Sequence, residues 1–145
     1  VAGEPDLGNP ASITFDKFNQ IKQSSKIKFL GNLDNISDLL RSTDIMVLPT
    51  YREGMPKVLQ EAAASGCAIV TTDVPGARDV VEHQVDGLLV PAKDPEKLAD
   101  AVEKLIKDKA LLQRFGKAIR QKAETQFCHK NIAMLHLKVY NQLLN

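Results

Sequence analysis

Glu53 and Glu61 are the residues whose type and spacing most readily support chemistry. They lie in the segment Asp44-Ile-Met-Val-Leu-Pro-Thr-Tyr-Arg-Glu-Gly-Met-Pro-Lys-Val-Leu-Gln-Glu-Ala. A carboxylate can accept hydrogen bonds from two neighbouring hydroxyl groups, and such charge-assisted bonds contribute about 1.5–3 kcal/mol each where water is excluded. Glutamates at this spacing are also common on solvated surfaces. The secondary structure around the two glutamates therefore has to indicate whether they bind hydroxyl groups or only face solvent.

Those elements place the glutamates between a predicted strand and a predicted helix. The apolar run Ile45–Leu48 has the length of a buried strand, and a helix is expected over 56–65, ending at Gly66. In parallel sheets, ligands bind at the carboxyl ends of the strands. The helix start offers free N–H groups and partial positive charge to a phosphate. Vicinal hydroxyls on both sides of a phosphate group are the chemistry of a sugar nucleotide.

The remaining pattern predicts an α/β fold: a Rossmann-like parallel sheet flanked by helices, with further helices at the C-terminus. Continuous apolar runs predict buried strands, and strand–helix alternation predicts right-handed crossovers. Asp94 and Pro95 predict the capped start of one later helix. The other strands are expected at 27–30, 68–71 and 88–90, and the other helices at 12–24, 35–42, 109–125 and 130–144, with a short helical turn after Val74.

Composition favours one soluble globular domain over residues 1–145. Apolar residues make up 43% and charged residues 26% of the chain, and the net charge is +1, which argues against nucleic acid as a partner. Cys67 and Cys128 match no metal or redox spacing and are expected to be reduced thiols in a cytoplasmic protein. The histidines have no metal-like spacing, so no metal site is predicted.

Taken together, these segments resemble the large family of retaining glycosyltransferases with two Rossmann-like domains, family four. Glu53 and Glu61 match its glutamate–seven residues–glutamate motif, and the similarity extends over residues 1–127. Other matching segments are Phe29-Leu-Gly, Asp44-Ile-Met-Val-Leu-Pro-Thr, Glu61-Ala-Ala-Ala-Ser-Gly, Ala68-Ile-Val-Thr-Thr, Gly87-Leu-Leu-Val-Pro and Asp94-Pro.

The resemblance implies a role for each matched residue. Glu53 would be the catalytic-site group that orients the donor sugar and stabilises positive charge on its ring, and Glu61 would bind the ribose. Leu33 would face the base. The family implies no cofactor and no metal, with the nucleotide sugar as substrate and the leaving phosphate as base. The backbone facing the sugar and diphosphate would be that of Gly54, Met55, Pro56, Lys57 and Val58.

A narrower similarity concerns the first eleven residues and Pro-Thr-Tyr-Arg-Glu-Gly-Met-Pro-Lys. These resemble bacterial enzymes that extend lipid-linked glycans in capsule and lipopolysaccharide synthesis. The resemblance implies transfer of a hexose or N-acetylhexosamine from a UDP-sugar to a lipid-linked or polysaccharide acceptor. Such an enzyme would be cytoplasmic and peripheral at the inner face of the membrane.

One part of the family's pattern is missing. The donor-binding domain of the family opens with a strand, a glycine-arginine loop and a lysine that together clamp the diphosphate, whereas Val1-Ala-Gly resembles the end of the next strand. We therefore expect an incomplete domain, truncated at its N-terminus and lacking the acceptor domain, from a fragment or a split gene. Without the cationic clamp, this chain alone should not transfer sugar. An exposed edge at 27–30 should favour dimerisation or strand exchange.

Three alternatives follow from the residues. A nicotinamide-binding Rossmann domain and a phosphate-binding P-loop both need glycine-rich loops that this sequence lacks. A sugar-nucleotide epimerase or a phosphorylase shares the architecture without the whole context of Glu53 to Gly66. A non-catalytic nucleotide-binding or structural fragment also remains, and nucleotide titration distinguishes it from the donor-binding interpretation.

Overall fold

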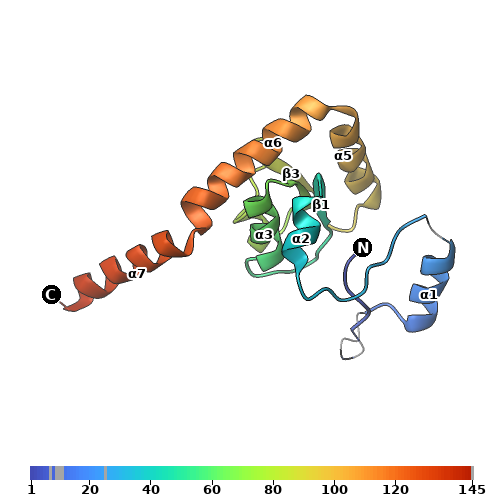
Figure 1. Ribbon diagram of the computed structural model, residues 1–145, viewed down its shortest axis with the longest axis horizontal. Coiled ribbons are helices and arrows are strands. Elements are labelled where there is room, and N and C mark those ends of the chain that lie inside the picture. The colour runs from blue at the N-terminus through green and yellow to red at the C-terminus, as the bar shows by residue number, and fades with distance from the viewer. Residues whose placement is uncertain (7, 9–11, 25, 145) are drawn as a thin grey trace. The chain divides into compact units, whose positions relative to one another are not determined.

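The computed structural model describes residues 1–6, 8, 12–24 and 26–144 (Figure 1). Contacts divide the chain into two compact units, Val1–Ile36 and Ser37–Asn145. In chain order the elements are α1 (Phe15–Ser24), α2 (Ile36–Arg41), β1 (Ile45–Leu48), α3 (Lys57–Ser65), β2 (Ala68–Thr72), α4 (Pro75–Arg78), β3 (Gly87–Val90), α5 (Pro95–Lys107), α6 (Lys109–Lys122), the π-helical turn η1 (Ala123–Phe127) and α7 (His129–Leu144).

The second unit is built on a parallel sheet of three strands in the order β1-β2-β3. Val47 is opposite Val70 in the first pair, and Val70 is opposite Leu88 in the second. The α/β prediction is therefore confirmed, including the middle strands and the helices that connect them. Its element boundaries differ by a few residues: α3 begins at Lys57, after Pro56, and the predicted helix over 109–125 is α6 followed by η1.

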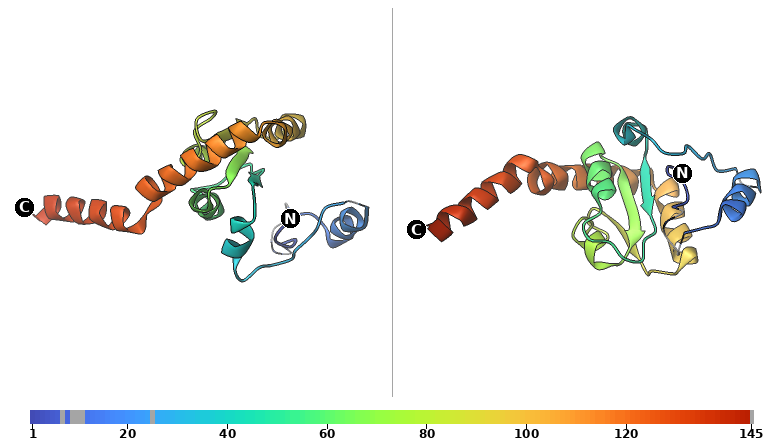
Figure 2. Two further views of the ribbon diagram at one scale, coloured as in Figure 1. Left: turned by 45° about the horizontal axis from the view of Figure 1, so that its top comes forward. Right: turned by 90° about the horizontal axis from the view of Figure 1, so that it is seen from below.

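The core lies on both faces of β2, whose residues are all buried. Because side chains alternate along a strand, Ala68 and Val70 face one side, where they pack with Leu88, Leu105 and Phe115. Helices α3 and α5 cover opposite faces of the sheet (Figure 2). The carboxyl ends of all three strands meet at one edge, which is where the loop carrying Glu53 begins.

The later helices begin as the sequence predicts. An Asp94 carboxylate oxygen accepts a hydrogen bond from the Lys97 N–H at 3.0 Å, and Asp108 accepts one from Leu111 at 2.9 Å. Side-chain caps of this kind contribute about 1 kcal/mol each. They fix the starts of α5 and α6, and therefore the directions in which these helices cross the sheet.

Helix α6 is packed closely against the turn that enters β2. Gly66 ends α3 with φ of +78°, in the left-handed region that favours glycine. A Cβ atom added to Gly116 in α6 would lie 2.5 Å from the Gly66 carbonyl oxygen, too close for any side chain. The two glycines therefore let backbone touch backbone at the amino end of β2.

A buried ion pair fastens the loop before β3 to α6. Lys122 Nζ lies 2.9 Å from an Asp86 carboxylate oxygen, and their side chains are 16% and 5% exposed. The other Asp86 oxygen accepts the Glu82 N–H at 2.7 Å. Both partners are therefore satisfied, which is the condition for keeping a charge inside a protein.

The predicted strand at 27–30, in the first unit, is wrong. Residues 27–30 form no strand, although Val1-Ala-Gly lies beside them. The Leu30 N–H donates to the Val1 carbonyl oxygen, and the Val1 ammonium donates to the Lys28 carbonyl oxygen. Gly3 and Gly31 form an antiparallel bridge. A strand needs a partner for its backbone groups along its length, and this pairing amounts to one isolated bridge and a few hydrogen bonds. Helix α1 also packs on this apolar run. Phe29 packs edge-on against Phe18 of α1, with ring centroids 5.1 Å apart.

Among the described strands, β1 and β3 each pair with β2 alone, so the edges of the sheet are Ile45–Leu48 and Gly87–Val90 and not 27–30. Dimerisation through such an edge stays a prediction. No described helix has the length and apolar character needed to span a bilayer.

Candidate functional site

The loop that carries Glu53 is fixed at its start by β2. Thr72 Oγ1 accepts the Thr50 N–H at 3.1 Å and also donates to the Thr50 carbonyl oxygen. Thr71 Oγ1 donates to the Leu48 carbonyl oxygen at 2.7 Å. Two neighbouring hydroxyls of one strand therefore hold the chain as it leaves β1, and they set where the following residues run.

The same loop is supported further along by α4. A Cβ atom added to Gly76 would lie 1.1 Å from the Gly54 carbonyl oxygen and 2.7 Å from that of Glu53. Only a glycine can stand here, because the two backbones are in direct contact. Gly76 is therefore a positioning residue for Glu53. The sequence predicts a short helical turn after Val74 but not its contact with the Glu53 loop. The signal was a glycine inside a helix, where alanine is intrinsically preferred.

Helix α3 presents an uncapped amino end beside this loop. Pro56 is its N-cap, with φ of −62° and no side-chain capping bond. Pro56 and Leu59 are buried, whereas Lys57 is exposed and Val58 is partly buried. Helix starts carry free N–H groups and partial positive charge, which suit an anion such as a phosphate.

Glu61 lies on the exposed side of α3 and borders a cavity. Its carboxylate is 3.8 Å from Lys57 Nζ, and 34% of its side chain is exposed. The cavity, about 390 Å³, is also lined by Arg120 of α6 and by His129 at the start of α7. Glu124 also lines the cavity and is paired with Arg120 at 2.9 Å. A partly exposed carboxylate at a cavity wall is suited to accept hydrogen bonds from the hydroxyls of a ligand.

Glu53, Gly54 and Met55 are exposed in the loop before α3. Glu53 thus precedes the start of α3 and Glu61 lies in the second turn of that helix. Leu33 is exposed and belongs to the first unit, which is described by itself. The assignment of roles to these residues stays a prediction.

The loop after β2 has its own internal ion pair. Arg78 Nε lies 2.5 Å from an Asp73 carboxylate oxygen. The hydrogen bond from Arg78 lowers the pKa of Asp73, so this carboxylate is charged at neutral pH. The ion pair stabilises the turn that contains Gly76.

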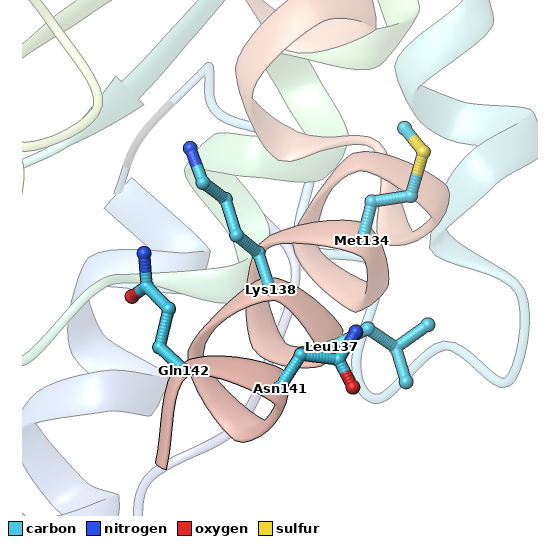
Figure 3. Close-up of a pocket in the computed structure, with 5 residues that line it drawn as sticks. All are labelled: Met134, Leu137, Lys138, Asn141 and Gln142. Atoms are coloured by element: carbon cyan, nitrogen blue, oxygen red, sulfur yellow. The ribbon is translucent and has the colours of Figure 1, made fainter. Parts of the chain in front are cut away.

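Another hollow, of about 620 Å³, lies on α7 (Figure 3). Its lining consists of Met134, Leu137, Lys138, Asn141 and Gln142, all from one helix, and their side chains splay in different directions. Such a surface lacks opposing walls and does not form a site. Among the described residues no group of three or more metal-ligating side chains gathers, and metal independence stays a prediction.

Residues 14–122 match the family model described as "Glycosyl transferases group 1". The chain is 32% identical, over 94% of its length and 35% of the relative's, to N,N'-diacetylbacillosaminyl-diphospho-undecaprenol alpha-1,3-N-acetylgalactosaminyltransferase of Campylobacter jejuni. It is 26% identical, over 77% of its length and 28% of the relative's, to UDP-Gal:alpha-D-GlcNAc-diphosphoundecaprenol alpha-1,3-galactosyltransferase of Escherichia coli. The chain thus spans about a third of the length of these relatives.

Solved structures show the same fold. Sucrose-phosphate synthase from Thermosynechococcus elongatus matches with a TM-score of 0.85 and 26% identity, over 99% of this chain and 37% of that one. HepE from Anabaena, solved in complex with UDP-glucose, matches with a TM-score of 0.81 and 22% identity, over 98% of this chain and 39% of that one. The second likeness, at this identity, is one of fold alone.

Proposed function

The chain belongs to the family of glycosyl transferases group 1, and we propose that it forms the donor-binding part of a retaining glycosyltransferase. The donor would be a UDP-sugar, and the group transferred a hexose or an N-acetylhexosamine. The acceptor would be a lipid-linked glycan or a polysaccharide of the bacterial surface. Two relatives whose names specify undecaprenol-linked acceptors support this acceptor class.

The observation that carries the proposal is the placement of Glu53 and Glu61 around the uncapped start of α3, at the carboxyl edge of the sheet. The helix start would hold the diphosphate through the N–H groups of Lys57 and Val58, beside the Lys57 ammonium. Glu61 would accept hydrogen bonds from the ribose hydroxyls. Glu53 would accept them from the sugar hydroxyls, with Gly54 and Met55 along the sugar.

Retention of configuration in one displacement requires the acceptor hydroxyl to attack the anomeric carbon on the face that the leaving phosphate occupies, with the phosphate taking its proton. Positive charge develops on the sugar ring in that step and must be stabilised. Glu53 is proposed for this role because a preorganised carboxylate stabilises charge that grows in the transition state. Its function is electrostatic and orienting, without a covalent bond to the sugar. The enzyme would work in the cytoplasm, peripheral to the membrane, with no metal.

Substituting each glutamate in turn should show which one contributes to binding of the nucleotide and which one to binding of the sugar. Glu61→Ala is expected to weaken binding of both UDP and UDP-sugars by roughly tenfold, because one charge-assisted hydrogen bond contributes about 1.4 kcal/mol or more. Glu53→Ala is expected to weaken UDP-sugar binding while leaving UDP binding unchanged. Calorimetric titration of the folded chain with UDP, UDP-glucose and UDP-N-acetylgalactosamine measures both.

Glu103→Ala is the matched control, because Glu103 forms a helical ion pair with Lys107 of the same spacing as Glu61 with Lys57, on α5. It should change neither affinity. If the two site variants both bind UDP and UDP-sugars like the unaltered chain, the assigned roles are wrong. If the folded, unaltered chain binds no nucleotide at all, the structural-fragment alternative replaces the proposal.

A further inference from the structure

A further cavity opens at the carboxyl edge of the sheet, on the face that α5 covers. It measures about 470 Å³, within the usual range of small-ligand pockets. Its apolar walls come from Pro49 after β1, Pro91 after β3, and Pro95 and Leu98 of α5. Helix α3 covers the opposite face of the sheet (Figure 2).

An aromatic ring and a cation stand at this cavity. Tyr51 lines it although 71% of the residue is exposed to solvent. The Lys93 ammonium lies 5.9 Å from the centroid of the Tyr51 ring, within the range of a cation–π contact.

The backbone at Lys93 is strained. Its φ is +64°, in the left-handed region that residues other than glycine rarely adopt. A lysine in this conformation costs about 1 kcal/mol relative to an unstrained residue. Glycine would remove that strain. Strained residues of this kind cluster at ligand sites.

We infer that this cavity binds a hexopyranose unit of the acceptor glycan, which rests on the proposed function. The apolar C–H face of a pyranose suits the Tyr51 ring and the proline walls, and its hydroxyls suit the Lys93 ammonium as donor. A few polar groups converging on apolar walls are typical of small-ligand sites. Tyr51 precedes Glu53 by two positions, so donor and acceptor sugars would flank one loop.

The test is an NMR titration of the whole chain with N-acetylgalactosamine, galactose and glucose at millimolar concentrations. The signals of Tyr51, Lys93 and Leu98 are expected to shift with hexose. Tyr51→Ala and Lys93→Gly are each expected to weaken this binding at least fivefold. Lys93→Gly keeps the backbone conformation, so its melting temperature should equal or exceed that of the unaltered chain. Lys104→Ala, an exposed lysine of α5, is the matched control and should leave hexose binding unchanged.

A parallel titration with UDP separates the inference from the donor-site proposal. Hexose shifts confined to Glu53 and Gly54, with normal UDP binding, would overturn the inference and leave the proposed function intact. Larger shifts of Tyr51 and Lys93 with uridine than with any hexose would also overturn it. Hexose shifts at Tyr51 and Lys93 without UDP binding would support the saccharide site and contradict the proposed function.

Discussion

Gly76→Ala is expected to lower the affinity of the chain for UDP-sugars by about 100-fold, since overpacking costs of 1–3 kcal/mol would fall on the site itself. The added Cβ would lie 1.1 Å from the Gly54 carbonyl oxygen, so the loop must move by more than a bond length. Because that loop is exposed, it can move without unfolding the sheet. The displaced Glu53 would no longer face the donor sugar. Calorimetry with UDP-glucose measures the loss.

Gly116→Ala is the matched control, because its Cβ would meet the Gly66 carbonyl oxygen at 2.5 Å, away from the Glu53 loop. It should lower the melting temperature while the molecules that remain folded keep their affinity for UDP-sugars. Equal affinity losses in the two variants would mean that Gly76 acts through general stability. Normal affinity in a folded Gly76→Ala variant would refute its positioning role.

Asp86→Ala is expected to lower the free energy of unfolding by about 3–5 kcal/mol, the usual cost of leaving a buried charge without its partner. The substitution strands the Lys122 ammonium, 16% exposed, and also removes the acceptor for the Glu82 N–H. Urea denaturation followed by circular dichroism gives the unfolding free energy. The loss should be large because Asp86 anchors α6 to the loop before β3.

Two further variants test that explanation. Glu103→Ala breaks an exposed pair, with side chains 59% and 71% exposed, and should change stability by less than about 1 kcal/mol. Lys122→Met combined with Asp86→Ala should be more stable than Asp86→Ala alone, because no charge is left unpaired. A double variant as unstable as the sum of both changes would show that charge pairing is not the cause.

The parts of the fold that the sequence predicts are those determined by local pattern. β1 and β2 are continuous apolar runs, and α5 starts at an aspartate cap followed by proline, so each is recognisable without its neighbours. Residues 27–30 show the limit of this reasoning. Their apolar pattern fits a strand, but a strand needs backbone pairing along its length. In this structure residues 1–3 pair with them through one isolated bridge and a few hydrogen bonds, and α1 packs against Phe29.

The candidate site likewise has one part that the sequence predicts and one part that it does not. Glu53 and Glu61 are close in sequence, and their placement before and within α3 follows from the helix that begins between them. The contact between Gly54 and Gly76, and that between Tyr51 and Lys93, join residues from different strand ends. Such contacts depend on the sheet register and the path of each loop, which no local pattern contains.

The support of the Glu53 loop by backbone contact has a consequence for evolvability. Gly76 contacts the carbonyl groups of Glu53 and Gly54, and Thr72 forms hydrogen bonds with the main chain of Thr50. The path of the loop therefore does not depend on its outward-facing side chains. Tyr51, Arg52 and Met55 are exposed and can be exchanged without rebuilding the scaffold. A mutant library confined to these positions would therefore explore new sugar preferences at little risk to folding.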